Sequence, residues 1–94
     1  MKKAYAASLY KNGLLGGGLY LDEEKAVFRT GKITVPARLR NLELYYNDID
    51  KISKGSILLL PAVTFNMKNG EEWRFVVFGC NDFIKNIGHF VSVK

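Results

Sequence analysis

The chain has 94 residues, a formal net charge of +5 and 48% hydrophobic residues, which together indicate one small globular domain over residues 1–94. This composition excludes a disordered chain, and no apolar run is long enough to form a helix that spans a bilayer. The single cysteine, Cys80, excludes an internal disulfide and a cysteine-rich metal site. We expect a cytoplasmic protein, either free or peripheral at the membrane. The positive charge suits anionic partners, but solubility is the preferred explanation.

The first part of the chain is predicted to form antiparallel strands. Residues 3–10 alternate in the way that a strand does. Residues 19–30 predict a hairpin with an acidic turn at 22–25. The three glycines at 16–18 are predicted to be a break that allows a bulge or a tight start of this hairpin. The segment 31–41 contains a proline and is predicted to be an excursion between strands.

Another strand is predicted where Leu42, Leu44 and Tyr46 alternate with Glu43 and Tyr45. A short turn at Asn47-Asp48 follows it, and the segment after the turn should place its isoleucines inward. These isoleucines are Ile49 and Ile52.

The segment 58–78 is predicted to be a long hairpin that follows a break at 54–56. Its first strand, 58–68, should place alternate residues on one face, namely Leu59, Pro61, Val63, Phe65 and Met67. Asn69-Gly70 is the strongest turn signal in the chain and predicts a type I′ turn, in which both central residues have positive φ. Residues 72–78 are predicted to form the return strand.

The end of the chain changes to a helical period. Asn81 is predicted to be the N-cap of a helix over 82–91, whose apolar stripe is Phe83, Ile84, Ile87, Phe90 and Val91. The predicted fold is therefore mainly β: a bent antiparallel sheet or partly open barrel of six or seven strands, capped by one C-terminal helix.

Three blocks of this sequence resemble the GRAM branch of the PH-like domains. They are Gly17-Gly18-Leu19-Tyr20-Leu21, then Asp48-Ile49, then the run 75–79 followed by Asn81-Asp82-Phe83-Ile84. The resemblance covers about Leu9 to Val91, nearly the whole chain. It departs from the family pattern at Tyr45-Tyr46-Asn47, where a proline or polar residue is usual, and the excursion at 31–41 is short. The resemblance implies a binding scaffold without enzymatic activity.

We expect no catalytic residue, metal or cofactor. Cys80 and His89 are alone of their kinds, and no third group is evident to orient them as a nucleophile and base. The acidic run at 22–24 lacks the alternating ligand spacing of a calcium loop. The glycines at 16–18 precede a strand and lack the lysine and hydroxyl residue of a phosphate-binding loop.

The best ligand-binding candidates are four basic residues around the excursion: Arg29, Lys32, Arg38 and Arg40. Ile33 and Val35 lie between them, and basic residues around apolar tips suit an anionic membrane surface. Each basic residue near such a surface contributes about 1 kcal/mol, so binding would be weak and salt-sensitive. PH-like relatives commonly bind acidic lipids through basic loops, which supports this alternative. The competing interpretation is that these side chains are simply solvated.

The preferred function is docking of a protein partner or self-association. Tyr45 opposes the predicted core-facing residues and is expected to be exposed. PH-like folds also bind peptides by adding a strand at a sheet edge. Nucleic acid is not expected to be a partner, because most tyrosines alternate in step with core positions and acidic residues are interspersed.

Overall fold

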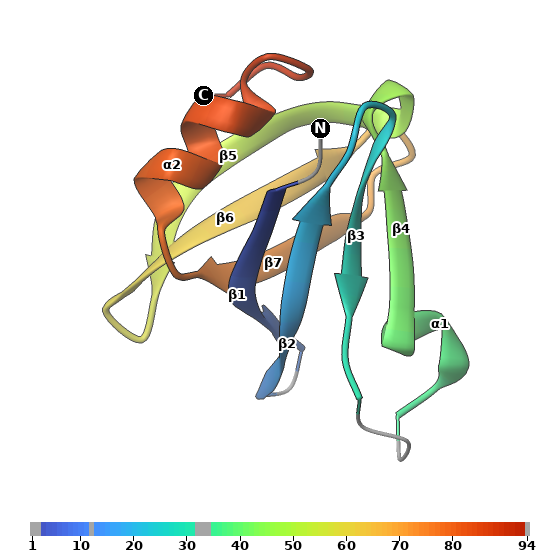
Figure 1. Cartoon of the computed structure of the whole chain (residues 1–94), viewed down its shortest axis with the longest axis vertical. Coiled ribbons are helices and arrows are strands. Elements are labelled where there is room, and N and C mark those ends of the chain that lie inside the picture. Colours follow the sequence, from blue (N-terminus) through green and yellow to red (C-terminus); the bar gives the residue numbers. More distant parts are fainter. Residues whose placement is uncertain (1–2, 12, 32–34, 94) are drawn as a thin grey trace.

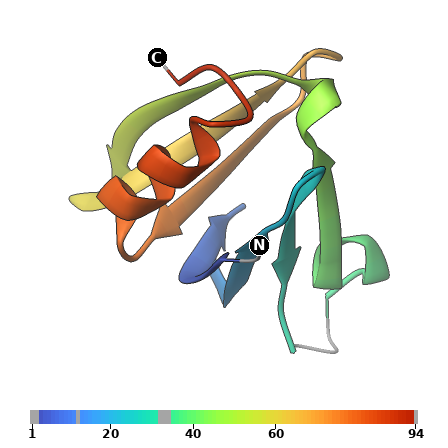
Figure 2. The same cartoon turned by 45° about the horizontal axis from the view of Figure 1, so that its top comes forward.

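The computed structural model describes residues 3–11, 13–31 and 35–93. Within these residues, seven strands form one antiparallel sheet with the order β4-β3-β2-β1-β7-β6-β5. The sheet curls into a half-barrel, and helix α2 lies across one opening (Figures 1 and 2). The strands are β1 (Lys3–Tyr10), β2 (Leu14–Leu21), β3 (Lys25–Arg29), β4 (Asn41–Tyr45), β5 (Ile49–Ile57), β6 (Leu60–Met67) and β7 (Glu72–Val77). The helices are α1 (Ala37–Arg40), a 3₁₀ turn η1 (Tyr46–Asp48) and α2 (Cys80–Ile87).

This architecture confirms the predicted mainly β fold and is compatible with a PH-like fold. Strand β1 joins the two halves of the sheet, because it pairs with β2 along its whole length and with β7 through residues 7–10. Alternate residues of β1, such as Ala7 and Leu9, are buried, as its alternating pattern predicts. We call the concave side of the sheet, which carries these residues, the inner face, and the other side the outer face.

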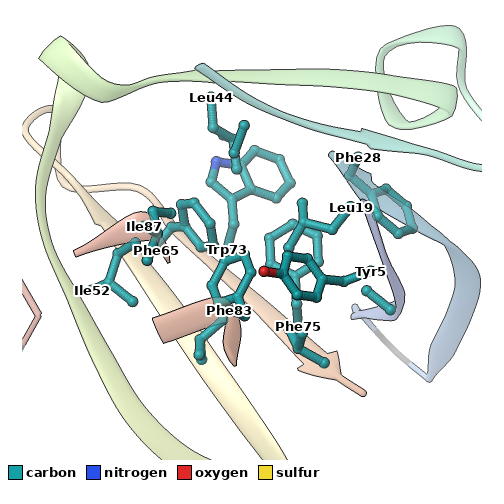
Figure 3. Packing of buried hydrophobic residues seen from close by; sticks show 14 of the residues in the cluster. Tyr5, Leu19, Phe28, Leu44, Ile52, Phe65, Trp73, Phe75, Phe83 and Ile87 are labelled. Atoms are coloured by element: carbon teal, nitrogen blue, oxygen red, sulfur yellow. The ribbon is translucent and has the colours of Figure 1, made fainter. Parts of the chain in front are cut away.

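Four phenylalanines form the centre of the core on the inner face. Phe28, Phe65, Phe75 and Phe83 are fully buried, and they come from β3, β6, β7 and α2. The Phe75 ring centroid lies 5.3 Å from that of Phe28 and 5.4 Å from that of Phe65. Figure 3 shows this cluster, with Phe83 reaching into it from the helix. The helix therefore closes the half-barrel by packing an apolar face onto the sheet.

The glycines at 16–18 lie inside β2 instead of breaking the chain before it. The hairpin predicted over 19–30 is present, but its first strand begins at Leu14. A Cβ atom added to Gly17 would overlap the backbone oxygen of Arg29, so this glycine allows two strands to approach closely. The predicted break was wrong because the sequence alone does not distinguish a glycine that allows close approach of two strands from a glycine in a turn.

The excursion at 31–41 contains the short helix α1, which follows Pro36. Leu39 of α1 is buried against the core. Strand β4 begins directly after the helix, at Asn41. Two residues of the predicted ligand site and its surroundings, Lys32 and Ile33, lie outside the described residues.

Strand β5 runs through the predicted break at 54–56, and the chain reverses at Leu58-Leu59. Ile57 pairs with Leu60, so the loop has two residues, and both have positive φ, 51° and 67°. A type I′ turn has this signature, and left-handed backbone costs an L-residue about 1–2 kcal/mol. The prediction that Leu59 shares a strand face with Val63 and Phe65 is wrong, because Leu59 lies in the turn and is exposed to 97%. Pro61 lies in β6 and alternates with them as predicted, but it is exposed.

The turn at Asn69-Gly70 is present but is not of type I′. Of its two residues only Gly70 has positive φ, at 94°. The Gly70 backbone N–H donates to the Met67 oxygen at 3.0 Å, and the Asn69 side chain accepts from the Glu71 N–H at 2.9 Å. This is the pattern of a turn followed by one left-handed glycine, which needs positive φ only once.

Helix α2 begins and ends earlier than predicted. Its N-cap is Gly79, with a φ of 80°, instead of Asn81, and its last residue is Ile87. Phe90 therefore lies beyond the helix, where its ring stacks on Tyr46 with centroids 4.7 Å apart. The following segment covers the start of the β5 edge, since the Ile52 N–H donates to the Ser92 oxygen at 2.9 Å.

Candidate functional site

Strand β4 forms one edge of the sheet, and its outward side has no strand partner in the described part of the chain. The Thr30 N–H donates to the Arg40 oxygen and the Tyr46 N–H donates to the Glu24 oxygen. Because hydrogen-bonded pairs alternate along an antiparallel ladder, the even-numbered residues of this segment bond to β3. The backbone N–H and C=O groups of Asn41, Glu43 and Tyr45 therefore point away from the sheet.

A groove of about 400 Å³ lies beside this free edge. Its apolar lining comes from β4 and from the β6–β7 hairpin: Leu42, Leu44, Met67 and Trp73. Leu44 and Trp73 are buried, whereas Leu42 and Met67 are half-buried and reachable. Figure 3 shows Leu44 beside the Trp73 indole. The groove thus combines unpaired backbone groups with an apolar floor.

The charged residues of this groove are mainly acidic. Glu43, Asp48 and Glu71 line it together with a single basic residue, Lys68, and all four are exposed. Glu43 also pairs with Lys25 of β3, whose Nζ lies 2.6 Å from a Glu43 carboxylate oxygen. This hydrogen bond is the main cause that raises the pKa of Lys25. The groove would therefore favour a ligand with basic side chains.

Tyr45, the predicted protein-interaction residue, is exposed to 40% at the end of β4. Its side chain lies on the outer face, because the neighbouring Leu44 is buried on the inner face. The Lys25 Nζ lies 5.1 Å from the centroid of the Tyr45 ring. The Tyr45 side chain therefore lies beside the free edge, and the Tyr45 backbone forms part of that edge.

The predicted basic residues lie at different places. Arg29 is on the outer face, where its Nε donates to the Asn41 side chain at 3.0 Å and its guanidinium lies 5.8 Å from the Tyr20 ring centroid. Arg38 lies instead over Trp73 of the inner-face cluster, 5.9 Å from the ring centroid. Arg29 and Arg38 are thus not brought to one surface.

Arg40 is half-buried, and its Nε is inaccessible without a hydrogen-bond partner among the described residues. Lys32 lies outside the described residues. Of the three predicted basic residues that the structure describes, only Arg38 shares an aromatic ring with another cation. That cation is Lys11, whose Nζ lies 5.2 Å from the Trp73 centroid.

An apolar cavity of about 320 Å³ opens beside Lys11. Its lining comes from the β1–β2 hairpin and from the excursion, and it includes Leu9, Leu14, Leu15, Val35 and Leu39. Lys11 and Arg38 make no ion pair in the described part of the chain. This end of the half-barrel therefore presents an apolar hollow with two cations nearby.

Cys80 and His89 lie in different environments. Cys80 is buried, and burial raises the pKa of its thiol despite the nearby Lys54. His89 is exposed after the end of α2. No group of three or more acidic, histidine or cysteine side chains could hold a metal ion within residues 3–11, 13–31 and 35–93.

The sequence assigned neither Trp73 nor Leu44 to a groove. Alternation separates the inner from the outer face but does not say which strands form the sheet edges. The exposed leucines at the β5–β6 turn were missed for another reason, since leucine is rare at positions with positive φ.

No protein-family model matches the chain, and no curated protein matches it at a significant level. None of the helices in the described residues has both the length and the apolar character needed to cross a membrane.

Proposed function

We propose that this domain is a non-enzymatic interaction module of the GRAM-type PH-like kind. Its β4 edge takes up an extended segment of a partner protein as an additional strand. The observation that carries the proposal is the free edge itself: the backbone groups of Asn41, Glu43 and Tyr45 point outward beside an apolar groove. Main-chain hydrogen bonds would supply affinity, as in other cases of strand addition.

The groove would select the side chains of the added strand. Alternate residues of that strand would point toward Leu42 and Met67, the two reachable apolar residues of the floor. The acidic groups Glu43, Asp48 and Glu71 would attract basic residues. The preferred partner segment therefore alternates apolar residues with others that include lysine or arginine.

Pairing of two β4 strands from two copies of the chain is less favourable. Glu43 is the central residue of Asn41–Tyr45, so full antiparallel pairing about a two-fold axis would place it opposite its own copy. Like charges directly opposite each other destabilise a strand pair. This favours a different protein as the occupant of the edge.

Selection of a random octapeptide display library on the immobilised domain tests the proposal. Enriched peptides should alternate apolar and basic residues, and a synthetic copy should shift the amide resonances of β4 in a ¹⁵N-labelled domain. Tyr45→Ala should weaken this binding, and high salt should reduce it only in part, because backbone hydrogen bonds remain. Peptides that shift other surfaces and leave β4 unchanged would contradict the proposal.

A second candidate function is binding of anionic lipid headgroups. It is supported by Lys11 and Arg38, two cations on the Trp73 ring beside an apolar cavity. Charge reversal at both Lys11 and Arg38 should then abolish binding to anionic vesicles while the thermal unfolding transition is retained. Unchanged vesicle binding by this variant would contradict the basic site. Charge reversal at Arg29, on the outer face, is the matched control and should have little effect.

A further inference from the structure

The tip of the β5–β6 hairpin, Leu58-Leu59, is the most exposed apolar feature among the described residues. Leu58 is exposed to 72% and Leu59 to 97%. Figures 1 and 2 both show this turn projecting away from the body of the half-barrel. The tip is therefore convex, and no other described segment covers it.

The fold does not require leucines at this tip. Both residues have positive φ, which asparagine and glycine adopt much more readily. Their side chains contribute little to the core, because they are almost completely exposed. Two strained apolar residues thus occupy a turn that favours asparagine and glycine. This indicates that the leucines contact something outside the folded domain.

Apolar residues continue from the tip along the outer face. Ile57, Ala62 and Val76 form a small buried cluster there, with Leu60 packed against it. Ala62 pairs with Val76, so the same register places Phe78 level with Leu60, nearer the tip. Phe78 is exposed to 56%. The partly exposed Leu60 and the exposed Phe78 therefore extend the apolar area of the tip.

The charge of the hairpin favours an anionic partner. The charged residues of β5 and β6 are Asp50, Lys51 and Lys54, and Lys54 is the one nearest the tip. Lys54 pairs with Val63, three pairs away from Ile57 and Leu60 at the tip. A lysine at this distance can reach headgroups when the tip lies among them.

We propose that the Leu58-Leu59 tip inserts into the headgroup–acyl boundary of an anionic bilayer. A fluid bilayer accommodates a convex apolar tip without a complementary pocket, and Lys54 lies within reach of the anionic headgroups. The insertion does not depend on the Lys11–Arg38 site or on the β4 edge. It would hold the domain at a membrane surface while the β4 edge stays available to a protein partner.

The variant Leu58→Asn/Leu59→Gly removes the apolar tip without disturbing the fold, because asparagine and glycine are the residues that this turn favours. We expect the wild-type chain to co-sediment with phosphatidylcholine vesicles that contain phosphatidylserine. The affinity of the variant for these vesicles should be lower by at least about tenfold. The matched control Leu58→Met/Leu59→Met keeps apolar side chains and should bind like the wild type. Equal binding by the wild type and the asparagine-glycine variant would overturn the proposal.

Insertion depth gives a second readout. Leu59→Trp should be quenched by brominated phospholipids, whereas the native Trp73, which is only 7% exposed, should not. Absence of quenching, or no vesicle binding by the wild type at low salt, would also overturn the proposal. The proposal would also be overturned if the wild type is a dimer in sedimentation velocity and the asparagine-glycine variant is a monomer. A second copy of the chain would then cover the tip. If tip variants bind normally and charge reversal at Lys11 and Arg38 abolishes binding, only the basic site is supported.

Discussion

The Tyr5 hydroxyl donates a hydrogen bond of 2.7 Å to the Asp82 carboxylate and so joins the first strand to the closing helix. Asn86 donates to the same hydroxyl at 2.8 Å and to Asp82 at 3.0 Å. The Tyr5 ring also packs edge-on against Phe83, with centroids 5.3 Å apart. These contacts fix α2 across the opening of the half-barrel, and they link residues 77 and 81 positions apart in the sequence.

Tyr5→Phe should lower the free energy of unfolding by about 1 kcal/mol, because it removes the hydroxyl from this network and keeps the ring. Chemical denaturation at neutral pH measures the change. Tyr20→Phe, at an exposed ring on the outer face, is the matched control and should change stability by less than about 0.5 kcal/mol. An equal effect of both substitutions would show that the network does not stabilise the helix.

Stability should fall between pH 10 and 12. Burial, followed by the hydrogen bond to Asp82, raises the pKa of Tyr5 from 10.0 to about 12. Below pH 10 both the folded and the unfolded chain hold the proton, so the stabilisation is complete; above it the unfolded chain loses the proton first. Denaturation at pH 9 and pH 11 should show this decline for the wild type and a smaller one for Tyr5→Phe. Burial also raises the pKa of Tyr46, so part of the decline should persist.

Gly17→Ala should destabilise the domain by about 1–3 kcal/mol, because its Cβ would meet the backbone oxygen of Arg29. Gly16→Ala is the matched control in the same strand, since a Cβ there meets nothing within 4 Å. It should be neutral or stabilising by up to about 1 kcal/mol. Thermal unfolding of the two variants measures the difference, and equal transition temperatures would refute the close approach of β2 and β3.

Leu58→Asn/Leu59→Gly should stabilise the isolated domain by about 1–3 kcal/mol, because it relieves two left-handed leucines. Equilibrium denaturation in the absence of lipid measures this gain. The methionine variant at the same two positions should show no gain, since methionine meets the same backbone restriction. A loss of stability in the asparagine-glycine variant would mean that the leucines support the fold.

The sequence predicted the strands and the mainly β architecture correctly wherever alternation was strong. Its errors concern glycine and turn positions. Gly17 allows a close approach inside β2, and Gly55 lies within β5, where the sequence predicted breaks. Conversely, Leu58 and Leu59 make a turn of the kind predicted for Asn69-Gly70. The pairing of neighbouring strands decided these cases against local preference.

The candidate site was less predictable than the fold. Exposure of Tyr45 was expected and is confirmed, because alternation with Leu44 fixes the face of each residue. The separation of Arg29 from Arg38 was not predictable, since nearness in sequence did not say that one lies on the outer face and the other over Trp73. Nor could the sequence show that β4 would be an edge strand beside Met67.

The most direct test of the β4 edge compares Glu43→Pro with Glu43→Ala for binding of a library-selected peptide. Both variants remove the carboxylate and its ion pair with Lys25, but only proline removes the outward N–H. This N–H makes no bond to β3, and proline is tolerated on edge strands, so both variants should fold. We predict that Glu43→Ala retains most of the peptide affinity and that Glu43→Pro lowers it at least about tenfold. Equal affinity of two folded variants would contradict strand addition at β4.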